Sequence, residues 1–168
     1  MPDTPQAPEN CSPFEKLLVI LALGEVEFAV VGGVAVSLNG FVRATEDVDI
    51  LVQDAPENIR RLLECLANWG EGWARELSMD DFAPQEGSIR VTEEFALDIF
   101  TRMRGFSFEA FRHRLRHFET AGVRIPFLGS EDLILLKQGS RREKDKLDVA
   151  ALRRIREEET GSQAPRRE

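Results

Sequence analysis

The sequence predicts an α/β (α+β) fold, in which helices flank a mixed β-sheet and further helices close the chain. Three observations support it. Helical and extended patterns alternate along the 168 residues, which is typical of a sheet covered by helices. Hydrophobic residues make up 42% of the chain, enough to fill one core. No apolar run approaches the roughly 20 residues that span a bilayer, so we expect no membrane association.

The first half of the chain begins with a helix signal. Ser12 and Glu15 form a capping box around Pro13, and Gly24 ends the helix that they start. Asp54 can cap a later helix, with Pro56 near its start and Glu57 at the capping-box position. The elements predicted in this half are a helix at 13–23, a strand at 28–31, a short helix at 34–38, a strand at 47–52 and a helix from about 56 to 66.

The second half contains a hairpin and closing helices. Its turn lies at Glu93-Glu94, and residues 70–85 have no clear pattern. The elements predicted here are strands at 88–92 and 95–100, a helix at 106–117, a strand at 123–127 and helices at 130–136 and 143–157. We expect one domain over residues 12–158, with flexible segments at 1–11 and 159–168.

Charge is distributed unevenly. Residues 1–100 hold 6 Lys/Arg and 19 Asp/Glu, a net −13, whereas residues 101–168 hold 16 Lys/Arg and 11 Asp/Glu, a net +5. An acidic half suits a cation and a basic half suits phosphates, although surface solvation explains the pattern equally well. The overall acidity argues against a broad duplex-binding surface. Cys11 and Cys65 lack metal-ligand spacing and no signal peptide is apparent, so we expect free thiols in the cytoplasm.

Two carboxylates share one face of the strand Asp47–Val52. Side chains alternate along a strand, so Asp47 and Asp49 point one way, while Val48, Ile50 and Val52 form an apolar face. The two carboxylates repel each other unless a cation lies between them, and Mg²⁺ prefers oxygen ligands. A strand end that reaches solvent is the alternative.

Asp98 is an acid within the apolar strand 95–100. Such a group is costly to bury unless it is paired or bound to metal. If this strand lies beside strand 47–52, Asp98 completes a cluster of three carboxylates. Such a cluster suits two metal ions that activate a hydroxyl and stabilise a leaving pyrophosphate. An edge position or a salt bridge is the alternative.

The segment between the first two strands contains phosphate-binding candidates. Gly32 and Gly33 turn the chain from a strand into a helix, which brings backbone N–H groups close to an anion. Arg43 can contact phosphate and Thr45 can hydrogen-bond near the acids. The alternatives need no ligand: the two glycines form only a tight turn, and Arg43 forms an ion pair with Glu46.

Late basic residues form a second candidate group between the last two predicted helices, at Lys137, Arg141, Arg142, Lys144 and Lys146. Such a patch can reach a triphosphate or a nucleic-acid end, and the alternative is a solvated corner between helices. His113 and His117 lie one helical turn apart, but no third ligand accompanies them. We interpret the two histidines as surface residues.

Together these residues resemble the nucleotidyltransferase superfamily, which has a polymerase-β-like fold. The motif runs from Gly32-Gly33 through Arg43, Thr45 and Asp47-Val48-Asp49 to the strand of Asp98. The chain is most similar to small bacterial AbiEii-like members, which act as toxins of type IV toxin–antitoxin pairs. The tail carries the matching pattern Ser130 to Lys137, Gly139, Lys144-Asp145 and Asp148. The resemblance covers roughly residues 15–157.

The resemblance implies transfer of a nucleoside monophosphate from an NTP to a hydroxyl acceptor, with Mg²⁺ or Mn²⁺ as cofactor. It implies that Asp47, Asp49 and Asp98 bind metal. It also implies that Gly32 and Gly33 approach the phosphates, and that Lys137 and Lys144 contact phosphate or acceptor. Many members carry serine where this chain has Gly33. The chain also lacks the larger C-terminal helical domain of longer relatives, so activity is expected to need a partner or a dimer.

The function predicted from the sequence is therefore metal-dependent nucleotidyl transfer in the cytoplasm. The acceptor is an RNA 3′ end, a protein or a small molecule, and an antitoxin or a second copy is a possible partner. A non-catalytic nucleotide-binding or protein-interaction module of the same fold is the alternative. A metal-dependent nuclease or phosphatase would use the same acids, but the glycine turn favours the transferase.

Overall fold

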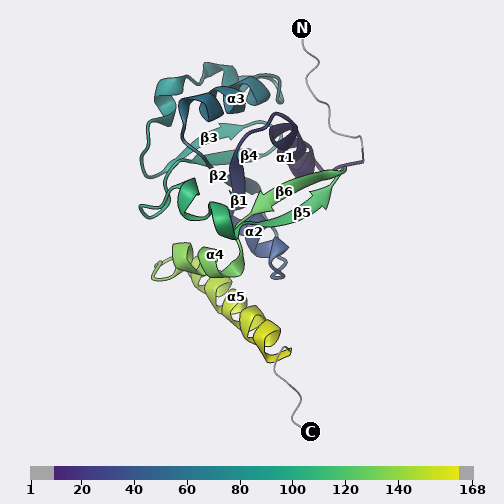
Figure 1. Ribbon diagram of the computed structural model, residues 1–168, viewed down its shortest axis with the longest axis vertical. Helices are drawn as coiled ribbons and strands as arrows, with labels where there is room; N and C mark the ends of the chain where they lie inside the picture. Colours follow the sequence, from purple (N-terminus) through teal and green to yellow (C-terminus); the bar gives the residue numbers. More distant parts are fainter. Residues whose placement is uncertain (1–9, 163–168) are drawn as a thin grey trace.

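A computed structural model describes residues 10–162, which form one six-stranded mixed sheet with helices packed around it (Figure 1). The strands are β1 (Phe28–Val31), β2 (Asp47–Val52), β3 (Ser88–Thr92), β4 (Ala96–Phe100), β5 (Arg116–Thr120) and β6 (Val123–Phe127). The α-helices are α1 (Pro13–Leu23), α2 (Gly32–Leu38), α3 (Pro56–Leu66), α4 (Ser130–Lys137) and α5 (Glu143–Ser162). Short 3₁₀ turns are η1 (Trp73–Glu76), η2 (Met79–Phe82), η3 (Phe108–Ala110) and η4 (Arg112–Arg114). The predicted fold class is confirmed.

The expected flexible ends fall mostly on residues 1–9 and 163–168, which lie outside the described residues. Helix α5 was expected to end near Glu157 and continues to Ser162. None of the helices between residues 10 and 162 combines the length and the apolar character that crossing a bilayer demands.

The sheet order β3-β4-β2-β1-β6-β5 places the two acid-bearing strands side by side. Strands β2 and β4 pair in parallel, as do β1 and β6, and the remaining neighbours are antiparallel. The register of the β2–β4 pair sets Asp49 directly beside Asp98. The strand of Asp98 therefore lies beside strand 47–52, as the predicted cluster of three carboxylates requires.

Strand β2 separates an apolar face from a polar one. Val48, Ile50 and Val52 are fully buried, and they join a core that includes the apolar sides of α1 and α3. Asp47 and Asp49 lie on the opposite face and remain partly accessible. Alternation along the strand thus produces the predicted division.

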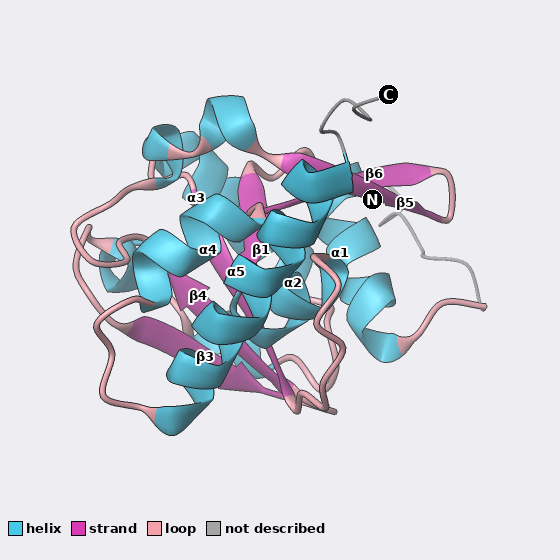
Figure 2. Ribbon diagram, turned by 90° about the horizontal axis from the view of Figure 1, so that it is seen from below, coloured by secondary structure: helices cyan, strands magenta, loops and turns pink. Residues whose placement is uncertain are grey.

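Helices α4 and α5 lie together at one side of the sheet, below it in Figure 1 and in front of it in Figure 2. Leu133 of α4 and Leu152 of α5 are buried in the core. Helix α4 also contacts α2, the helix that follows the diglycine turn. The C-terminal helices therefore lie close to the acidic residues of β2 and β4.

The predicted helix at 106–117 is wrong. The segment forms the 3₁₀ turns η3 and η4 and then enters β5, which pairs with β6 as a hairpin. Phe108 and Phe111 are buried at a spacing of three, which fits 3₁₀ turns. Strand β5 covers the edge of β6, a need that local periodicity does not reveal. His113 and His117 consequently lie on different elements rather than on one helix face.

The predicted cap of α3 is also wrong. Ala55 occupies the N-cap position and provides no side-chain cap. Asp54 instead accepts a 2.7 Å ion-paired hydrogen bond from Arg102, and Glu57 pairs with Arg60. A charge-assisted bond to a distant arginine competes successfully with a local cap.

Asn58 of α3 connects three segments through its buried side chain. Its Oδ1 accepts from the backbone N–H of Glu27 at 2.8 Å. Its Nδ2 donates to the carbonyls of Glu27 at 2.9 Å and Gln53 at 2.7 Å. The amide thereby joins the start of α3 to the residues that precede β1 and follow β2.

Replacing this amide tests the packing of α3. Asn58→Ala should lower the free energy of unfolding by about 2 kcal/mol, because it leaves the Glu27 N–H and the Gln53 carbonyl without this partner, whereas the Glu27 carbonyl still accepts from the Gln53 N–H. Urea denaturation followed by circular dichroism measures the loss. Asn10→Ala, at an exposed position before α1, should change stability by less than about 0.5 kcal/mol. Equal effects of the two substitutions would contradict this account of Asn58.

Candidate active site

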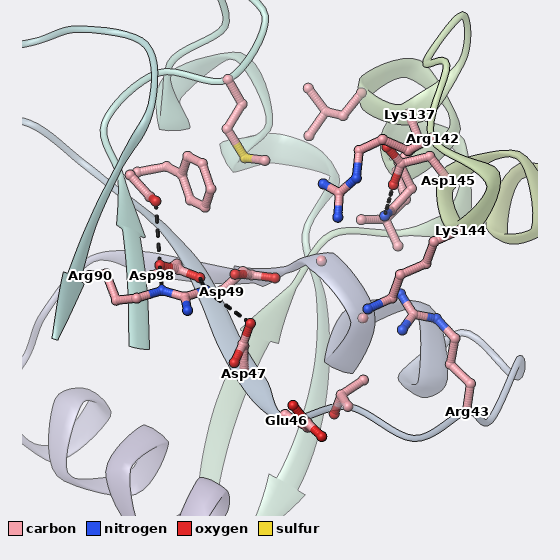
Figure 3. A pocket seen from close by; sticks show the side chains of 18 of the residues that line it. Arg43, Glu46, Asp47, Asp49, Arg90, Asp98, Lys137, Arg142, Lys144 and Asp145 are labelled. Carbon is pink, nitrogen blue, oxygen red and sulfur yellow. Dashed lines mark hydrogen bonds and ion pairs between the residues drawn. The ribbon is translucent and has the colours of Figure 1, made fainter. Parts of the chain in front are cut away.

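A pocket of about 680 Å³ opens where β2, β3, β4 and the start of α2 meet α4 and α5 (Figure 3). The residues proposed from the sequence to bind metal or nucleotide all line it: Asp47, Asp49, Asp98, Gly32, Gly33, Arg43, Thr45, Lys137 and Lys144. Figure 3 shows Asp47, Asp49 and Asp98 on one side of the pocket, and most of the basic side chains, together with Asp145, on the other. The tertiary structure therefore gathers residues that lie up to 112 positions apart, from Gly32 to Lys144.

The acids lie on two neighbouring strands, and a basic residue on a third strand extends their row. Asp49 on β2 lies beside Asp98 on β4, and Asp98 lies opposite Arg90 on β3. Asp47 lies one step along β2, on the same face as Asp49. The row ends at Gly32, where β1 turns into α2.

Arg90 is the residue of this cluster that the sequence interpretation missed. Its Nε donates to Asp98 Oδ1 at 2.9 Å and its Nη2 donates to Asp98 Oδ2 at 2.8 Å. The same Nη2 reaches Asp47 Oδ2 at 3.0 Å. Ser88 Oγ adds a 3.3 Å bond to Asp98. Asp98 therefore forms the salt bridge that was the alternative interpretation, and it also lies beside Asp49 as the cluster of three acids requires.

The position of Arg90 follows from a turn one residue longer than the predicted one. Residues 93–95 connect the strands, and this register sets Arg90 opposite Asp98. Directly opposed residues on one face of a hairpin interact. A two-residue turn at Glu93-Glu94 would set Ile89 opposite Asp98, so the predicted turn did not identify Arg90 as the partner of this acid.

Among residues 10–162, Asp49 has no comparable cationic partner. The pKa of this carboxyl is raised from its ordinary 3.8 to about 6, first by burial and then by the charge of Asp98. A hydrogen bond with Asp98 and the charge of Asp47 act in the same direction, and the charge of Lys137 opposes them. Asp49 is thus the member of the cluster whose negative charge is least compensated.

The two glycines are required by close packing as well as by the turn. At Gly32, where φ is +65°, a Cβ would lie 1.9 Å from Asp49 Oδ2. At Gly33, a Cβ would lie 2.6 Å from the methyl group of Thr45 and 3.0 Å from the guanidinium of Arg43. A larger residue at position 33 would therefore require the side chain of Thr45 or Arg43 to move. Thr45 packs its methyl group here, and its hydroxyl makes no hydrogen bond within residues 10–162.

Arg43 is held by α5 and not by its neighbour Glu46. Its Nε and Nη2 donate to the two carboxylate oxygens of the fully buried Asp148, at 2.8 and 2.9 Å. Its Nη1 is buried without a hydrogen-bond partner. One donor of a fixed guanidinium therefore remains free beside Gly33 in the pocket wall.

Lys137 belongs to the same network. Its Nζ lies 3.0 Å from Asp148 and 3.1 Å from Asp145. The hydroxyl of Ser140 donates to Asp145 at 2.7 Å, and Lys137 and Ser140 together hold the pKa of Asp145 below its usual range despite the opposing effect of burial. Lys137 is therefore a positioned and neutralised cation at the pocket.

Lys144 differs from Lys137 because it forms no ion pair within the described residues. Figure 3 shows it alongside Arg43, and Arg142 also lines the pocket. The late basic group predicted from the sequence is thus divided. Lys146 pairs with Glu143 at 3.0 Å away from the pocket.

The side chains fit a divalent cation by chemistry, although their present arrangement does not form a complete site. Three carboxylates supply the oxygen donors that Mg²⁺ prefers, and the uncompensated charge of Asp49 is stabilised by an added cation. Across residues 10–162, however, no three His, Cys, Asp or Glu side chains are arranged to hold a metal ion. Arg90 binds oxygens of both Asp47 and Asp98 in this arrangement.

The raised pKa of Asp49 predicts a pH-dependent stability. Because the folded pKa of about 6 exceeds the ordinary 3.8, the folded state gains from protonation. The stability contributed at low pH is lost as the pH rises from about 4 through 6. In metal-free buffer with a chelator, Asp49→Asn should therefore be more stable than the parent at pH 8, by on the order of 2 kcal/mol.

The difference should largely disappear near pH 3, where Asp49 is mostly protonated in both states, and thermal unfolding at the two pH values measures it. Asp80→Asn, which replaces an exposed acid on η2, should show little change at either pH. A destabilised Asp49→Asn protein at pH 8 would mean that the carboxylate is better compensated than its surroundings indicate.

Comparisons with known proteins agree with this geometry. The family of nucleotidyltransferases of unknown function (DUF6036) matches residues 14–157. No curated protein matches the chain. The crystal structure of the lincosamide antibiotic adenylyltransferase LnuA with lincomycin bound has a TM-score of 0.60 at 17% identity, and the alignment covers 90% of this chain and 99% of that one.

A putative nucleotidyltransferase from Thermotoga maritima matches with a TM-score of 0.48 at 16% identity over 89% of this chain and 91% of that one. An antigenic nucleotidyltransferase-like protein from Paracoccidioides brasiliensis matches with a TM-score of 0.47 at 17% identity, covering 82% and 75%. The LnuA likeness identifies the fold as that of nucleotidyltransferases. Because the family model covers nearly all the described residues, the chain belongs to the family of nucleotidyltransferases of unknown function.

Proposed function

We propose that this protein transfers a nucleoside monophosphate from an NTP to a hydroxyl acceptor, with Mg²⁺ or Mn²⁺ held by Asp47, Asp49 and Asp98. The observation that carries the proposal is the meeting of these three carboxylates with the diglycine turn in one pocket of a nucleotidyltransferase-family chain. A bound divalent ion supplies charge neutralisation at the phosphates and activation of the attacking hydroxyl.

The remaining pocket residues suit a triphosphate. Gly32 and Gly33 present backbone without side chains, so phosphate oxygens can approach closely. Among residues 10–162, the buried Nη1 of Arg43 has no hydrogen-bond partner and Lys144 has no ion-pair partner, and both residues line this pocket. In the proposal Lys137 contacts phosphate or acceptor from the position that Asp145 and Asp148 fix. Fixed donors lose little freedom on binding, which favours a preorganised phosphate site.

The favoured acceptor is a small hydroxylated molecule. The alignment with LnuA, an adenylyltransferase of lincosamide antibiotics, covers 99% of that chain. The small-molecule acceptor of LnuA supports a small-molecule acceptor for this protein. Phe100, Met103, Leu133 and Leu136 form an apolar part of the pocket lining. Such a lining suits the carbon skeleton of a small acceptor or a nucleobase.

A second candidate is a non-catalytic nucleotide-binding or protein-interaction module. The ion pairs from Arg90 to Asp47 and Asp98 favour this candidate, because they neutralise two of the three acids without metal. A toxin role with an antitoxin partner, or a dimer, is compatible with either candidate. Growth arrest on expression of the parent, relieved in Asp49→Asn, would support a catalytic toxin.

Loss of a single carboxylate should separate the two candidates. Purified protein is incubated with each labelled NTP, Mg²⁺, cellular RNA, protein and a panel of aminoglycosides and lincosamides. Pyrophosphate release and label transfer are measured. Asp49→Asn should lower the rate at least about a hundredfold, since even the partners of metal ligands are worth 10–100-fold.

Asp80→Asn serves as the matched control for that assay and should retain the parental rate. Unchanged turnover in Asp49→Asn would remove the metal role from this residue. Absence of transfer to any acceptor, combined with metal-independent nucleotide binding in calorimetry, would favour the non-catalytic module.

Divalent metal should also stabilise the fold. Mg²⁺ or Mn²⁺ at about 100 times its Kd should add about 2.7 kcal/mol to the free energy of unfolding, because the ion binds only the native state. A rise of Tm in differential scanning calorimetry would report this effect. The Asp47→Asn/Asp49→Asn double variant should show no rise, whereas a flat response of the parent would contradict a metal site.

A further inference from the structure

Arg90 occupies the centre of the acidic cluster in the described structure, and the proposed function leaves it without a task. It lies on β3, the edge strand of the sheet. Its guanidinium forms a two-bond fork with Asp98 and a third bond with Asp47. Figure 3 shows the side chain between these two carboxylates, with Asp49 to one side.

The oxygens that Arg90 binds are the ones that a divalent ion would need. The arginine fork engages both oxygens of Asp98, and Nη2 also takes Asp47 Oδ2. A metal ion bridging Asp47 and Asp98 would bring a 2+ charge to within a few ångströms of the guanidinium. At such a distance like charges repel strongly. Arginine and a bridging metal therefore exclude each other at this pair.

Arginine is the partner that can leave. The Arg90 side chain is 54% exposed, whereas the Asp98 side chain is 8% exposed. Ser88 also holds Asp98 through its hydroxyl. The sheet thus fixes the carboxylates. The exposed guanidinium can move into solvent, because an ion pair with an exposed partner contributes little free energy.

We propose that Arg90 is a resident counter-ion that occupies the Asp47–Asp98 pair in the metal-free protein and must leave before a divalent ion bridges those two carboxylates. This inference rests on the proposed function, because it concerns the same metal site. It makes Arg90 a positioning residue that sets metal affinity. Asp49, which Arg90 does not contact, remains available for the first approach of the ion.

Mn²⁺ binding provides the test, with electron paramagnetic resonance of free Mn²⁺ as the readout. Removal of the competitor in Arg90→Gln should tighten Mn²⁺ binding about tenfold, the equivalent of one modest ion pair. Arg90→Lys keeps the charge without the fork and should give an intermediate Kd. Arg60→Gln removes an exposed arginine that pairs with Glu57, and it should leave the Kd unchanged.

Thermal unfolding shows whether each variant is folded. A second measurement uses the parent protein alone and therefore does not depend on any substitution. In the parent, the ¹⁵N-edited NMR signal of the Arg90 Nε–H group should shift and exchange faster with solvent as Mg²⁺ is added. A signal that stays unperturbed while Mg²⁺ binds would overturn the inference.

The outcomes separate this inference from the proposed function. Metal-dependent NTP binding by the parent, with the same or weaker Mn²⁺ affinity in a folded Arg90→Gln protein, would overturn the inference alone. Absence of Mn²⁺ binding in the parent and in the variants would overturn both. Tighter binding in Arg90→Gln together with the Mg²⁺-induced change at Arg90 would support it.

Discussion

The parallel pairing of β2 with β4 is the constraint on which the pocket depends, because it forces Asp49 and Asp98 into adjacent positions. Neither strand can slip by one residue without turning its buried apolar residues toward solvent. Val48, Ile50 and Val52 on β2 and Leu97 and Ile99 on β4 are all buried, so hydrophobic burial fixes the register. The electrostatic cost of the adjacent carboxylates is thus imposed by the core.

The protein compensates this cost unevenly across the row. Asp98 is bound by Arg90 and Ser88, and Asp47 shares the same guanidinium. Asp49 is left with a raised pKa, between neighbouring acids on one side and the Gly32 backbone on the other. An uncompensated carboxylate in a concave, preorganised site is typical of a functional position. The uneven compensation also explains why no complete metal site exists among the described residues while the ligand chemistry is present.

The C-terminal helices are part of the pocket and not an appendage. Asp148 on α5 is fully buried and binds both Arg43, from the loop after α2, and Lys137, from the end of α4. A buried carboxylate is stable only when its partners satisfy it, so these three groups hold one another in place. The network orients a free donor of Arg43 toward the diglycine turn. The basic wall of the pocket therefore depends on α5.

The sequence by itself determined the fold class, most of the elements and the polar face of β2. These features follow from local patterns, because the alternation of side chains and the capping box at Ser12 act over a few residues. It also identified Asp98 as an unusual acid in an apolar strand. These are the properties that short-range physical chemistry dictates.

Only the tertiary structure decided which partners the charged groups choose. Arg43 pairs with Asp148 and not with Glu46, Asp54 pairs with Arg102 and does not cap α3, and Arg90 joins the acids. Segment 106–117 forms 3₁₀ turns and the start of β5, which pairs with β6. Ion pairs and strand pairing join residues far apart in the chain, so their competition is resolved by distances that exist only after folding.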